Sequence, residues 1–195
     1  MPRTSAEQRR KEFVTAAVKV IAEKGIEGAT TRRIAAEAGA SLATLHYCYD
    51  SKEELFHDIF ENMANAVRDS VWHVAPGCGL GRAAATLLRQ LMGWYLSEET
   101  YARAQSEVFY WGIRQHPEAG MKYYSAFFEV VEEHLIRGLR DDDDRNLVPI
   151  LTHMVFAAAD GLLPQWLAHG DPTATAVDID TFAEAFERLT ERRRP

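Results

Sequence analysis

The chain has 195 residues, of which 47% are hydrophobic and 26% charged, and a formal net charge of −7. These values are typical of a soluble globular protein. No run approaches the roughly 18–20 apolar residues of a membrane span, and the first residues lack the apolar segment of a secretory signal, so we expect a cytoplasmic protein with no membrane partner. The two cysteines, Cys48 and Cys78, are too few for a disulfide framework, and we expect free thiols.

The negative charge lies outside the first part of the chain. Residues 1–57 contain nine Lys or Arg and eight Asp or Glu, whereas residues 58–195 contain thirteen and twenty-one. The cations of the first segment gather near the N-terminus and again at Arg32, Arg33 and Lys52. An acidic body held more than a Debye length of about 8–10 Å from DNA phosphates is compatible with DNA binding.

Nearly every segment predicts a helix, beginning with an amphipathic one over about residues 6–24 that Gly25 terminates. A short helix over 32–38 follows, capped by Thr30 or Thr31. Only Gly39-Ala40-Ser41 separates it from another short helix over 42–47. Two short helices joined by a three-residue turn form a helix-turn-helix unit.

Six longer helices are predicted after this unit. The first of them begins after Asp50 or Ser51 and is followed by a break at Pro-Gly-Cys-Gly. The others are expected at about residues 82–97, 100–115, 118–139, 147–163 and 178–193. Pro164 should kink or end the helix before it, with 165–168 as a further turn. The prediction is an all-α protein of about nine helices.

The spacing of apolar residues gives the helix-turn-helix a buried side and an exposed side. The buried side is expected to pack on the first helix through Ile34, Ala35, Ala38, Leu45 and Tyr49. The second short helix then exposes Leu42, Ala43, Thr44, His46 and Tyr47, where their groups are available to base edges and phosphates. Small Ala43 permits close approach to the groove, the Thr44 side chain suits phosphate or thymine, and the His46 ring can donate or accept at a base edge.

The segment from Thr30 to Leu55, TTRRIAAEAGASLATLHYCYDSKEEL, resembles the DNA-binding head of the tetracycline-repressor (TetR) family. The usual pattern there is Thr-x-x-x-Ile-Ala-x-x-Ala-Gly-Val-Ser, then x-Gly-Thr-Leu-Tyr-Tyr-His-Phe, then x-Ser-Lys-Glu-x-Leu. The resemblance implies a three-helix DNA-binding domain at residues 1–53 and a helical ligand-binding and dimerisation domain at 54–195. It implies a regulator, most simply a repressor, that binds a palindromic double-stranded DNA operator as a homodimer. A small, largely apolar or amphipathic inducer would release it.

Carried over residue by residue, the resemblance implies DNA contacts at Thr31 and Arg32, a recognition surface at Leu42, Ala43, Thr44, His46 and Tyr47, and a phosphate contact at Lys52, where helix N–H groups add to its charge. Ala43, His46 and Cys48 depart from the usual Gly, Tyr and His, so the base preference of relatives does not transfer. Residues 3–11 form either a basic arm in the adjacent groove or a solvated tail.

Aromatic residues concentrate in the central predicted helices, either as ordinary core or around an apolar pocket. The resemblance favours a pocket, because the family binds inducers between these helices. The expected ligand contacts are Trp94, Phe109, Tyr110, Tyr124, Phe128 and Trp166, with Glu107 or Asp160 as polar anchors. Asp160 lies in an apolar run and is either an internal hydrogen-bond acceptor or a ligand contact. An acidic aromatic pocket would favour a cationic or amphipathic ligand through cation–π contact.

The last two helices have apolar faces that would form a four-helix dimer interface, the assembly seen in the family, unless they pack against the chain's own body. The expected contacts are Leu151, Met154, Val155, Phe182 and Phe186. No catalytic residue, metal site or cofactor is expected, since the seven histidines have no metal-binding spacing and no phosphate loop or nucleophile elbow is present. The rival hypotheses are a purely structural helix-turn-helix, an interaction protein that no longer binds DNA, and an enzyme.

Overall fold

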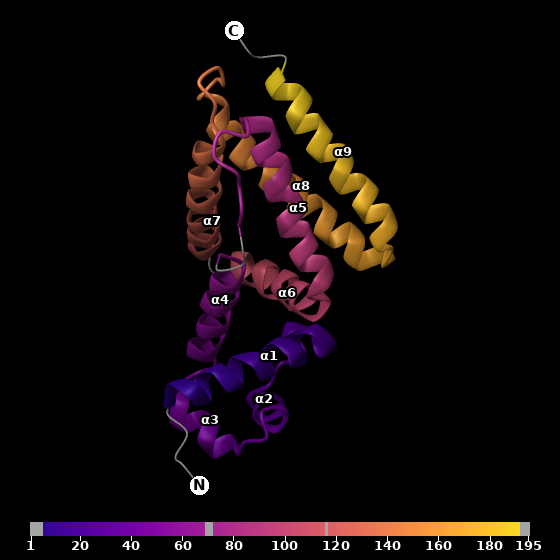
Figure 1. The fold of residues 1–195 in the computed structure, drawn as a ribbon. Helices are drawn as coiled ribbons and strands as arrows, with labels where there is room; N and C mark the ends of the chain where they lie inside the picture. The colour runs from indigo at the N-terminus through magenta and orange to yellow at the C-terminus, as the bar shows by residue number, and fades with distance from the viewer. Residues whose placement is uncertain (1–5, 69–71, 116, 192–195) are drawn as a thin grey trace. The chain divides into compact units, whose positions relative to one another are not determined.

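The computed structural model describes residues 6–68, 72–115 and 117–191, in which the chain forms nine α-helices and no strand (Figure 1). The helices are α1 (Ala6–Gly28), α2 (Thr31–Glu37), α3 (Leu42–Cys48), α4 (Lys52–Arg68), α5 (Leu80–Ser97), α6 (Glu99–Gln115), α7 (Pro117–Gly138), α8 (Leu147–His169) and α9 (Pro172–Glu191). The prediction of an all-α fold is confirmed. The chain divides into two compact units, residues 1–66 with 99–120 and residues 67–98 with 121–195.

The first unit combines the helix-turn-helix with α6, a helix from much later in the chain. Helix α1 packs against α2, α3 and α6, and α2 packs against α3. Apolar residues of all these helices and of α4 form one core, centred on Phe13, Ile21, Ile34, Leu45, Leu55, Phe56, Ile59, Ala104 and Val108. Helices α4 and α6 therefore share this core with the helix-turn-helix.

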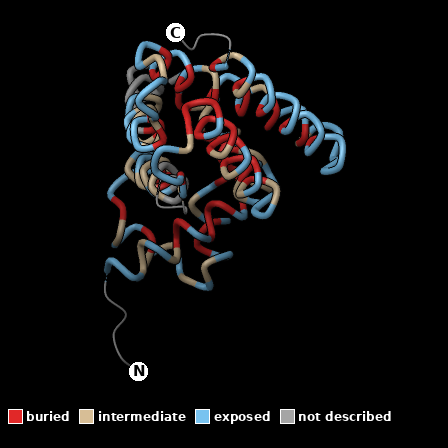
Figure 2. Tube along the Cα trace, turned by 45° about the horizontal axis from the view of Figure 1, so that its top comes forward, coloured by how far each residue is buried: buried red, intermediate tan, exposed pale blue. Residues whose placement is uncertain are grey.

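The second unit is built on α5, which packs along α9 and α8 (Figure 1). Its core contains small and branched residues of α5, α8 and α9, among them Ala84, Leu88, Leu91, Leu151, Val155, Leu162, Ala183 and Phe186. Figure 2 shows the helix that leads to the C label with buried residues along one side and exposed residues along the other. Helix α9 is therefore an amphipathic outer helix of this unit.

Helix α8 is unusually apolar. It has 23 residues, and its most apolar window has a mean hydropathy of 1.5, enough by length and composition to cross a membrane, although no run of this kind was expected. In this window 56% of the residues are buried inside the structure. Burial on two sides, against α5 and α9, accounts for an apolar composition of this kind.

The local signals at the ends of α1, α2 and α3 act as the sequence predicts. Gly25 interrupts α1 with a φ of 68°, a value that favours glycine. The Thr30 hydroxyl accepts a hydrogen bond from the Arg33 N–H at 3.3 Å, and the Ser41 hydroxyl accepts one from the Thr44 N–H at 3.1 Å. N-caps of this type contribute about 1 kcal/mol each, which matters for helices of only seven residues.

Two predicted boundaries in the second half are wrong. Helix α8 continues through Pro164 to His169, because Pro164 lies on the exposed face of the helix, where water can satisfy the backbone carbonyl that it leaves unbonded. Helix α9 begins at Pro172, six residues earlier than expected. The Asp171 carboxylate caps it by accepting from the N–H groups of Thr173 and Ala174 at 2.9 and 3.0 Å.

Candidate nucleic-acid interface and ligand groove

Helix α3 turns the predicted reading face away from the core. Leu45 is buried, whereas Tyr47 has 80% of its surface exposed. Ala43 and His46 are also exposed, and Leu42 and Thr44 are half-buried at the edge of this face. The Thr44 hydroxyl lies 2.8 Å from that of Ser41, so it already takes part in the cap of α3. The Thr44 methyl group is then the part best placed to meet a base.

The starts of α2 and α4 carry the other predicted DNA contacts. Thr31 is half-buried and Arg32 is exposed. The neighbouring Arg33 instead turns back and donates to the carbonyl of Gly28 at 2.8 Å, which ties the turn between α1 and α2. Lys52 is exposed at the first position of α4, and its ammonium lies 5.0 Å from the centroid of the Phe56 ring.

Arg10 of α1 holds the end of α3. Its Nε and Nη2 donate to the carbonyl of Cys48 at 3.1 and 2.9 Å, and its guanidinium pairs with the Glu54 carboxylate of α4. The same group lies 4.6 Å from the centroid of the Tyr49 ring. Three contacts from one side chain therefore fix the C-terminal end of α3 between α1 and α4.

This position of Arg10 corrects part of the basic-arm hypothesis. Arg10 belongs to α1 and points into the domain, while Arg9 pairs with Glu12 at 2.6 Å and Lys11 with Glu7 at 3.3 Å. Arg3 lies outside the described residues. Within the described part of residues 3–11, the cations are thus engaged with the helix itself or with α3 and α4.

Tyr49 completes the connection between α3 and α4. Its hydroxyl donates to the Asp58 carboxylate at 2.6 Å, and its ring meets Phe13 edge-on with centroids 6.3 Å apart. Burial raises the pKa of Tyr49 far above its ordinary value, and the hydrogen bond to Asp58 raises it further. Tyr49 therefore remains a neutral donor at any physiological pH.

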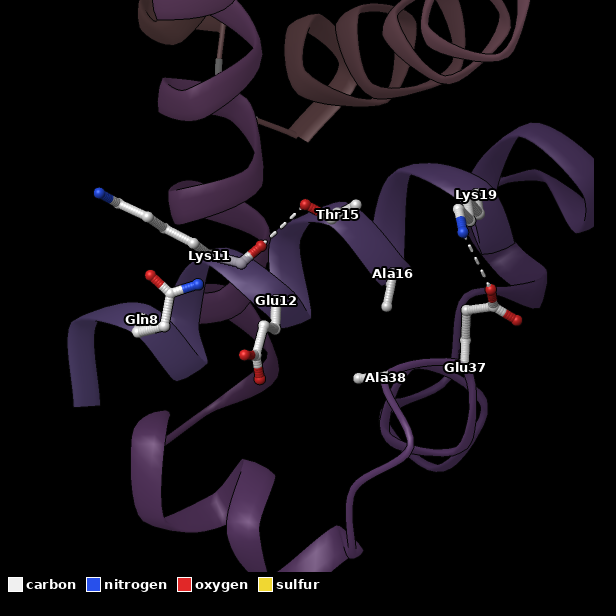
Figure 3. A pocket seen from close by; sticks show the side chains of 8 residues that line it. All are labelled: Gln8, Lys11, Glu12, Thr15, Ala16, Lys19, Glu37 and Ala38. Carbon is white, nitrogen blue, oxygen red and sulfur yellow. Dashed lines mark hydrogen bonds and ion pairs between the residues drawn. The ribbon is translucent and has the colours of Figure 1, made fainter. Parts of the chain in front are cut away.

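A polar cleft lies beside the helix-turn-helix, between α1 and α2 (Figure 3). It has a volume of about 240 Å³, and charged side chains dominate its walls. The Lys19 ammonium and the Glu37 carboxylate lie 3.7 Å apart and join the two helices across it. No aromatic side chain lines this cleft, which makes it unsuitable for a largely apolar ligand.

A second hollow, the α7–α8 groove, has the opposite character. It has a volume of about 410 Å³ and lies between α7 and α8; its lining residues are Tyr124, Ser125, Phe128, His153, Phe156, Ala157 and Asp160. The Phe128 ring centroid lies 5.6 Å from that of Tyr124 and 5.1 Å from that of Phe156. The His153 ring meets Phe128 edge-on at 4.6 Å. Aromatic surface thus forms most of the groove wall.

Asp160 brings a carboxylate into this aromatic groove. The Tyr124 hydroxyl donates to its Oδ2 at 2.5 Å. Desolvation by the surrounding side chains raises the pKa of Asp160 above its ordinary value, and the hydrogen bond from Tyr124 acts in the opposite direction. Asp160 is nevertheless open to solvent on the surface of α8, so its carboxylate is accessible to a ligand.

Three of the eight predicted ligand contacts, Tyr124, Phe128 and Asp160, line the α7–α8 groove. Trp166 is buried in the core of the second unit, and Trp94 packs against Tyr95 with centroids 5.2 Å apart. Glu107, Phe109 and Tyr110 belong to α6 in the first unit. The Glu107 carboxylate accepts from the backbone N–H of Ile26 at 3.3 Å, so it serves as an internal link between α6 and the end of α1.

Sequence reasoning missed four groove residues, Ser125, His153, Phe156 and Ala157. A signal for some of them was present. His153, Ala157 and Asp160 are spaced by four and three residues, which places them on one face of α8. Among the described residues, no group of three His, Cys, Asp or Glu side chains is arranged to hold a metal ion.

The predicted dimer contacts divide into two groups. Leu151, Val155 and Phe186 are buried inside the second unit, so the chain's own helices already cover them. Met154 is half-buried, and Phe182 has 42% of its surface exposed. Other apolar side chains exposed on α8 and α9 are Ile150 and Val177, with 44% and 63% of their surface accessible. Of the five predicted contacts, Met154 and Phe182 are therefore the ones still accessible to a partner.

Known proteins are similar to this chain in the segment that contains the helix-turn-helix. The family model described as bacterial regulatory proteins of the tetR family matches residues 13–59. The nicotine-responsive transcriptional repressor HdnoR of Paenarthrobacter nicotinovorans is 29% identical over 175 residues, which cover 88% of this chain and 89% of the relative.

Solved structures of similar fold extend over nearly the whole chain. A transcriptional regulator from Rhodococcus sp. Rha1 has a TM-score of 0.76 and 19% identity, covering 92% of this chain and 96% of that one. The multidrug binding protein EbrR in complex with ethidium has a TM-score of 0.62 and 21% identity, covering 93% and 98%.

The match over residues 13–59 falls on the helices that expose the α3 face and that Arg10 and Tyr49 join. The similar proteins are regulators of transcription and not enzymes, which confirms the expectation drawn from the sequence. Residues 13–59 thus form a DNA-binding domain of the kind found in bacterial regulatory proteins of the tetR family, and its helix-turn-helix consists of α2 and α3.

Proposed function

We propose that this regulator binds a palindromic DNA operator as a homodimer, represses transcription, and leaves the operator when a small amphipathic effector binds its second unit. The observation that carries the proposal is the exposed face of α3, which Ser41 caps at one end and Arg10 holds at the other. A recognition helix needs a fixed orientation of this kind. Its side chains distinguish one base pair from another only when they enter the groove at defined positions.

Individual side chains have different roles in this proposal. His46 and Tyr47 meet base edges, Leu42, Ala43 and the Thr44 methyl group supply apolar contact, and Thr31, Arg32 and Lys52 bind the phosphate backbone. The exposure of these residues supports the assignment for Ala43, His46, Tyr47, Arg32 and Lys52. Substitutions at His46 and Tyr47 should therefore change which DNA sequence is preferred. Substitutions at the phosphate contacts should change the affinity for all DNA sequences alike.

Dimerisation is proposed to use the outer apolar residues of α8 and α9, with Phe182 and Val177 as central contacts. Large exposed apolar side chains on adjacent helices are typical of such interfaces. A dimer would place two recognition helices about one turn of DNA, roughly 34–36 Å, or a multiple of it apart. Because such a protein acts on chromosomal DNA, we place it in the cytoplasm.

The α7–α8 groove is the proposed effector site. Its volume of about 410 Å³ and its aromatic walls are typical of a small-molecule site. Two similar proteins respond to or bind aromatic nitrogen compounds, nicotine for HdnoR and ethidium for EbrR. An effector that binds the DNA-free conformation more tightly than the DNA-bound one would weaken the DNA complex. The difference between these two binding free energies is typically about 1–3 kcal/mol.

The test is binding of the purified full chain to the DNA upstream of its own gene, compared with a shuffled sequence of the same length, at two salt concentrations. We expect the upstream DNA to bind at least a hundred times more tightly, and sedimentation to show two chains per site. Equal affinity for both DNAs would contradict a role as a sequence-specific regulator.

A further inference from the structure

We infer that the α7–α8 groove binds planar aromatic cations, with Asp160 as the counter-ion and Tyr124 as the residue that orients the Asp160 carboxylate. This inference rests on the proposed function, since it names the chemical class of the effector.

The walls offer both ring faces and ring edges. Tyr124 and Phe156 stand at 89° to each other with centroids 6.2 Å apart, and the Phe128 ring is tilted with respect to both. Because these rings point in different directions, a flat ligand can lie against the face of one and meet the edge of another. The negative face of an aromatic ring also attracts a cation within about 6 Å of its centroid.

The charge in the groove comes from a single carboxylate among its lining residues. Asp160 lies at the end opposite His153 along α8, two helical turns away. The hydrogen bond from Tyr124 uses Oδ2 and fixes the plane of the carboxylate. We therefore expect Oδ1 to meet the ligand, and a ligand with its positive charge beside Asp160 and its rings toward Phe128 would match both features.

The surroundings of Asp160 also favour a cation over a neutral ligand. The aromatic side chains that desolvate the carboxylate make its ionised form less favourable than in water. A positive ligand offsets this penalty, whereas a neutral one of the same shape adds apolar surface and increases it. Selectivity for charge is therefore expected in addition to selectivity for shape.

A second copy of the chain is a less suitable occupant. His153 and Ala157 lie on the exposed face of α8, so a partner chain could in principle cover the groove. The proposed dimer contacts, however, centre on Phe182 and Val177 of α9, and neither residue lines the groove. The groove is therefore left to a small ligand in this proposal.

The experiment uses two kinds of probe that share a planar tricyclic ring system: 5-methylphenanthridinium and ethidium represent the cationic form, and phenanthridine is the uncharged ring system at neutral pH. Binding is measured on the full chain without DNA, because ethidium intercalates into DNA. Asp160→Asn keeps the shape and the acceptor for Tyr124 but removes the charge. Asp141→Asn removes one charge from an exposed loop residue outside the groove and serves as the matched control.

We expect Asp160→Asn to weaken binding of the cationic probes by about tenfold or more, and to leave phenanthridine binding unchanged or make it stronger. Asp141→Asn should change neither. Tyr124→Phe should weaken ethidium binding by a smaller factor, about threefold, and again spare phenanthridine. This ratio between the two probes separates an orienting role of Tyr124 from a merely structural one, which would affect both.

Three results would overturn the inference: no ethidium binding by the unaltered chain, equal losses for both probes in Asp160→Asn, or a change of oligomeric state in Asp160→Asn, which would identify a second copy as the occupant. These results leave the proposed function intact if the chain still selects its upstream DNA. Conversely, equal binding to upstream and shuffled DNA would contradict the proposed regulator function. The dependence of ligand binding on the charge of Asp160 could still be measured in that case.

Discussion

The guanidinium of Arg10 in α1 donates two hydrogen bonds to the carbonyl of Cys48, the last residue of α3. A helix end leaves several carbonyl groups without partners, and a cation is well placed there because it also interacts favourably with the helix dipole. Arg10 thereby influences the orientation of α3, which begins more than thirty residues later in the sequence. We therefore expect Arg10 to act by positioning α3 and not by contacting a phosphate.

Arg10→Gln should therefore lower the affinity for the operator by about tenfold while leaving the salt dependence of non-specific binding unchanged. A phosphate contact would instead reduce the slope of log K against log [salt] by about one when it is lost. The measurement is fluorescence anisotropy with operator and shuffled DNA over a series of salt concentrations. Arg9→Gln, which breaks only a pair within α1, is the control and should retain operator selectivity.

Lys52→Ala and His46→Ala should affect binding in different ways. Loss of Lys52 should weaken operator and shuffled DNA about equally and flatten the salt slope, because a phosphate contact is independent of sequence. Loss of His46 should relax discrimination at one operator position, a change of about 1–3 kcal/mol. Identical profiles for the two variants across a set of operator mutants would argue against this division of roles.

Glu107→Ala should reduce the free energy of unfolding by about 1 kcal/mol, because the buried N–H of Ile26 loses its acceptor. It should leave ethidium binding by the second unit unchanged. Thermal unfolding and a binding titration on the same sample decide between this structural role and a ligand contact. A large loss of ligand affinity without loss of stability would restore Glu107 as a polar anchor.

Ethidium binding should weaken on acidification, at a higher pH than an ordinary aspartate would produce, because the pKa of Asp160 is raised. The carboxylate is the form that attracts the cation, so affinity is present above this pKa and is lost as the pH falls through it. His153 and Tyr124 also face the groove, and the Asp160→Asn variant keeps both of them. An unchanged pH profile in this variant would show that Asp160 is not the titrating group.

The raised pKa has a second consequence for the protein without a ligand. The folded state favours the protonated carboxyl, so this group supports stability at low pH and loses that support as the pH rises through its pKa. Asp160→Asn should then have the same melting temperature as the unaltered chain at neutral pH, or a slightly higher one.

Phe182→Glu should convert a dimer into monomers and reduce operator affinity by at least a hundredfold, because one half-site alone supplies half of the contacts. Ile136→Glu places the same charge on another exposed apolar residue of the second unit and should have no such effect. Sedimentation at several protein concentrations provides the measurement. Dissociation by both variants, or by neither, would contradict the assignment of the interface to α8 and α9.

The reading head was predictable from sequence because its signals are local. The Ser41 cap acts on an N–H group only three residues away. Ile34 and Leu45 are each recognised as buried from the pattern of apolar residues within their own short helix. By contrast, the contact of Glu107 joins residues separated by 81 positions, and nothing in the neighbourhood of Glu107 indicates it. Glu107 was predicted as a polar anchor of the ligand, whereas it lies on α6 in the first unit.

The groove was predictable in part for the same reason. Tyr124 and Phe128 form a helical i, i+4 pair and were recognised, as was the unusual carboxylate of Asp160. The contribution of His153 depends on which side of α8 is covered by α5 and α9, and that is a property of packing between helices. The early start of α9 could have been predicted, since Asp171 followed by Pro172 is a typical helix start.

The inclusion of α6 in the same compact unit as the helix-turn-helix limits how this protein can be divided or recombined. A fragment ending at residue 66 would expose to water the apolar surface that Ala104 and Val108 cover. A chimera that receives only the first segment from another regulator would pair a foreign α1 with the native α6. Exchange of DNA specificity between such proteins, by engineers or by recombination, therefore requires either both segments together or substitutions confined to the outward face of α3.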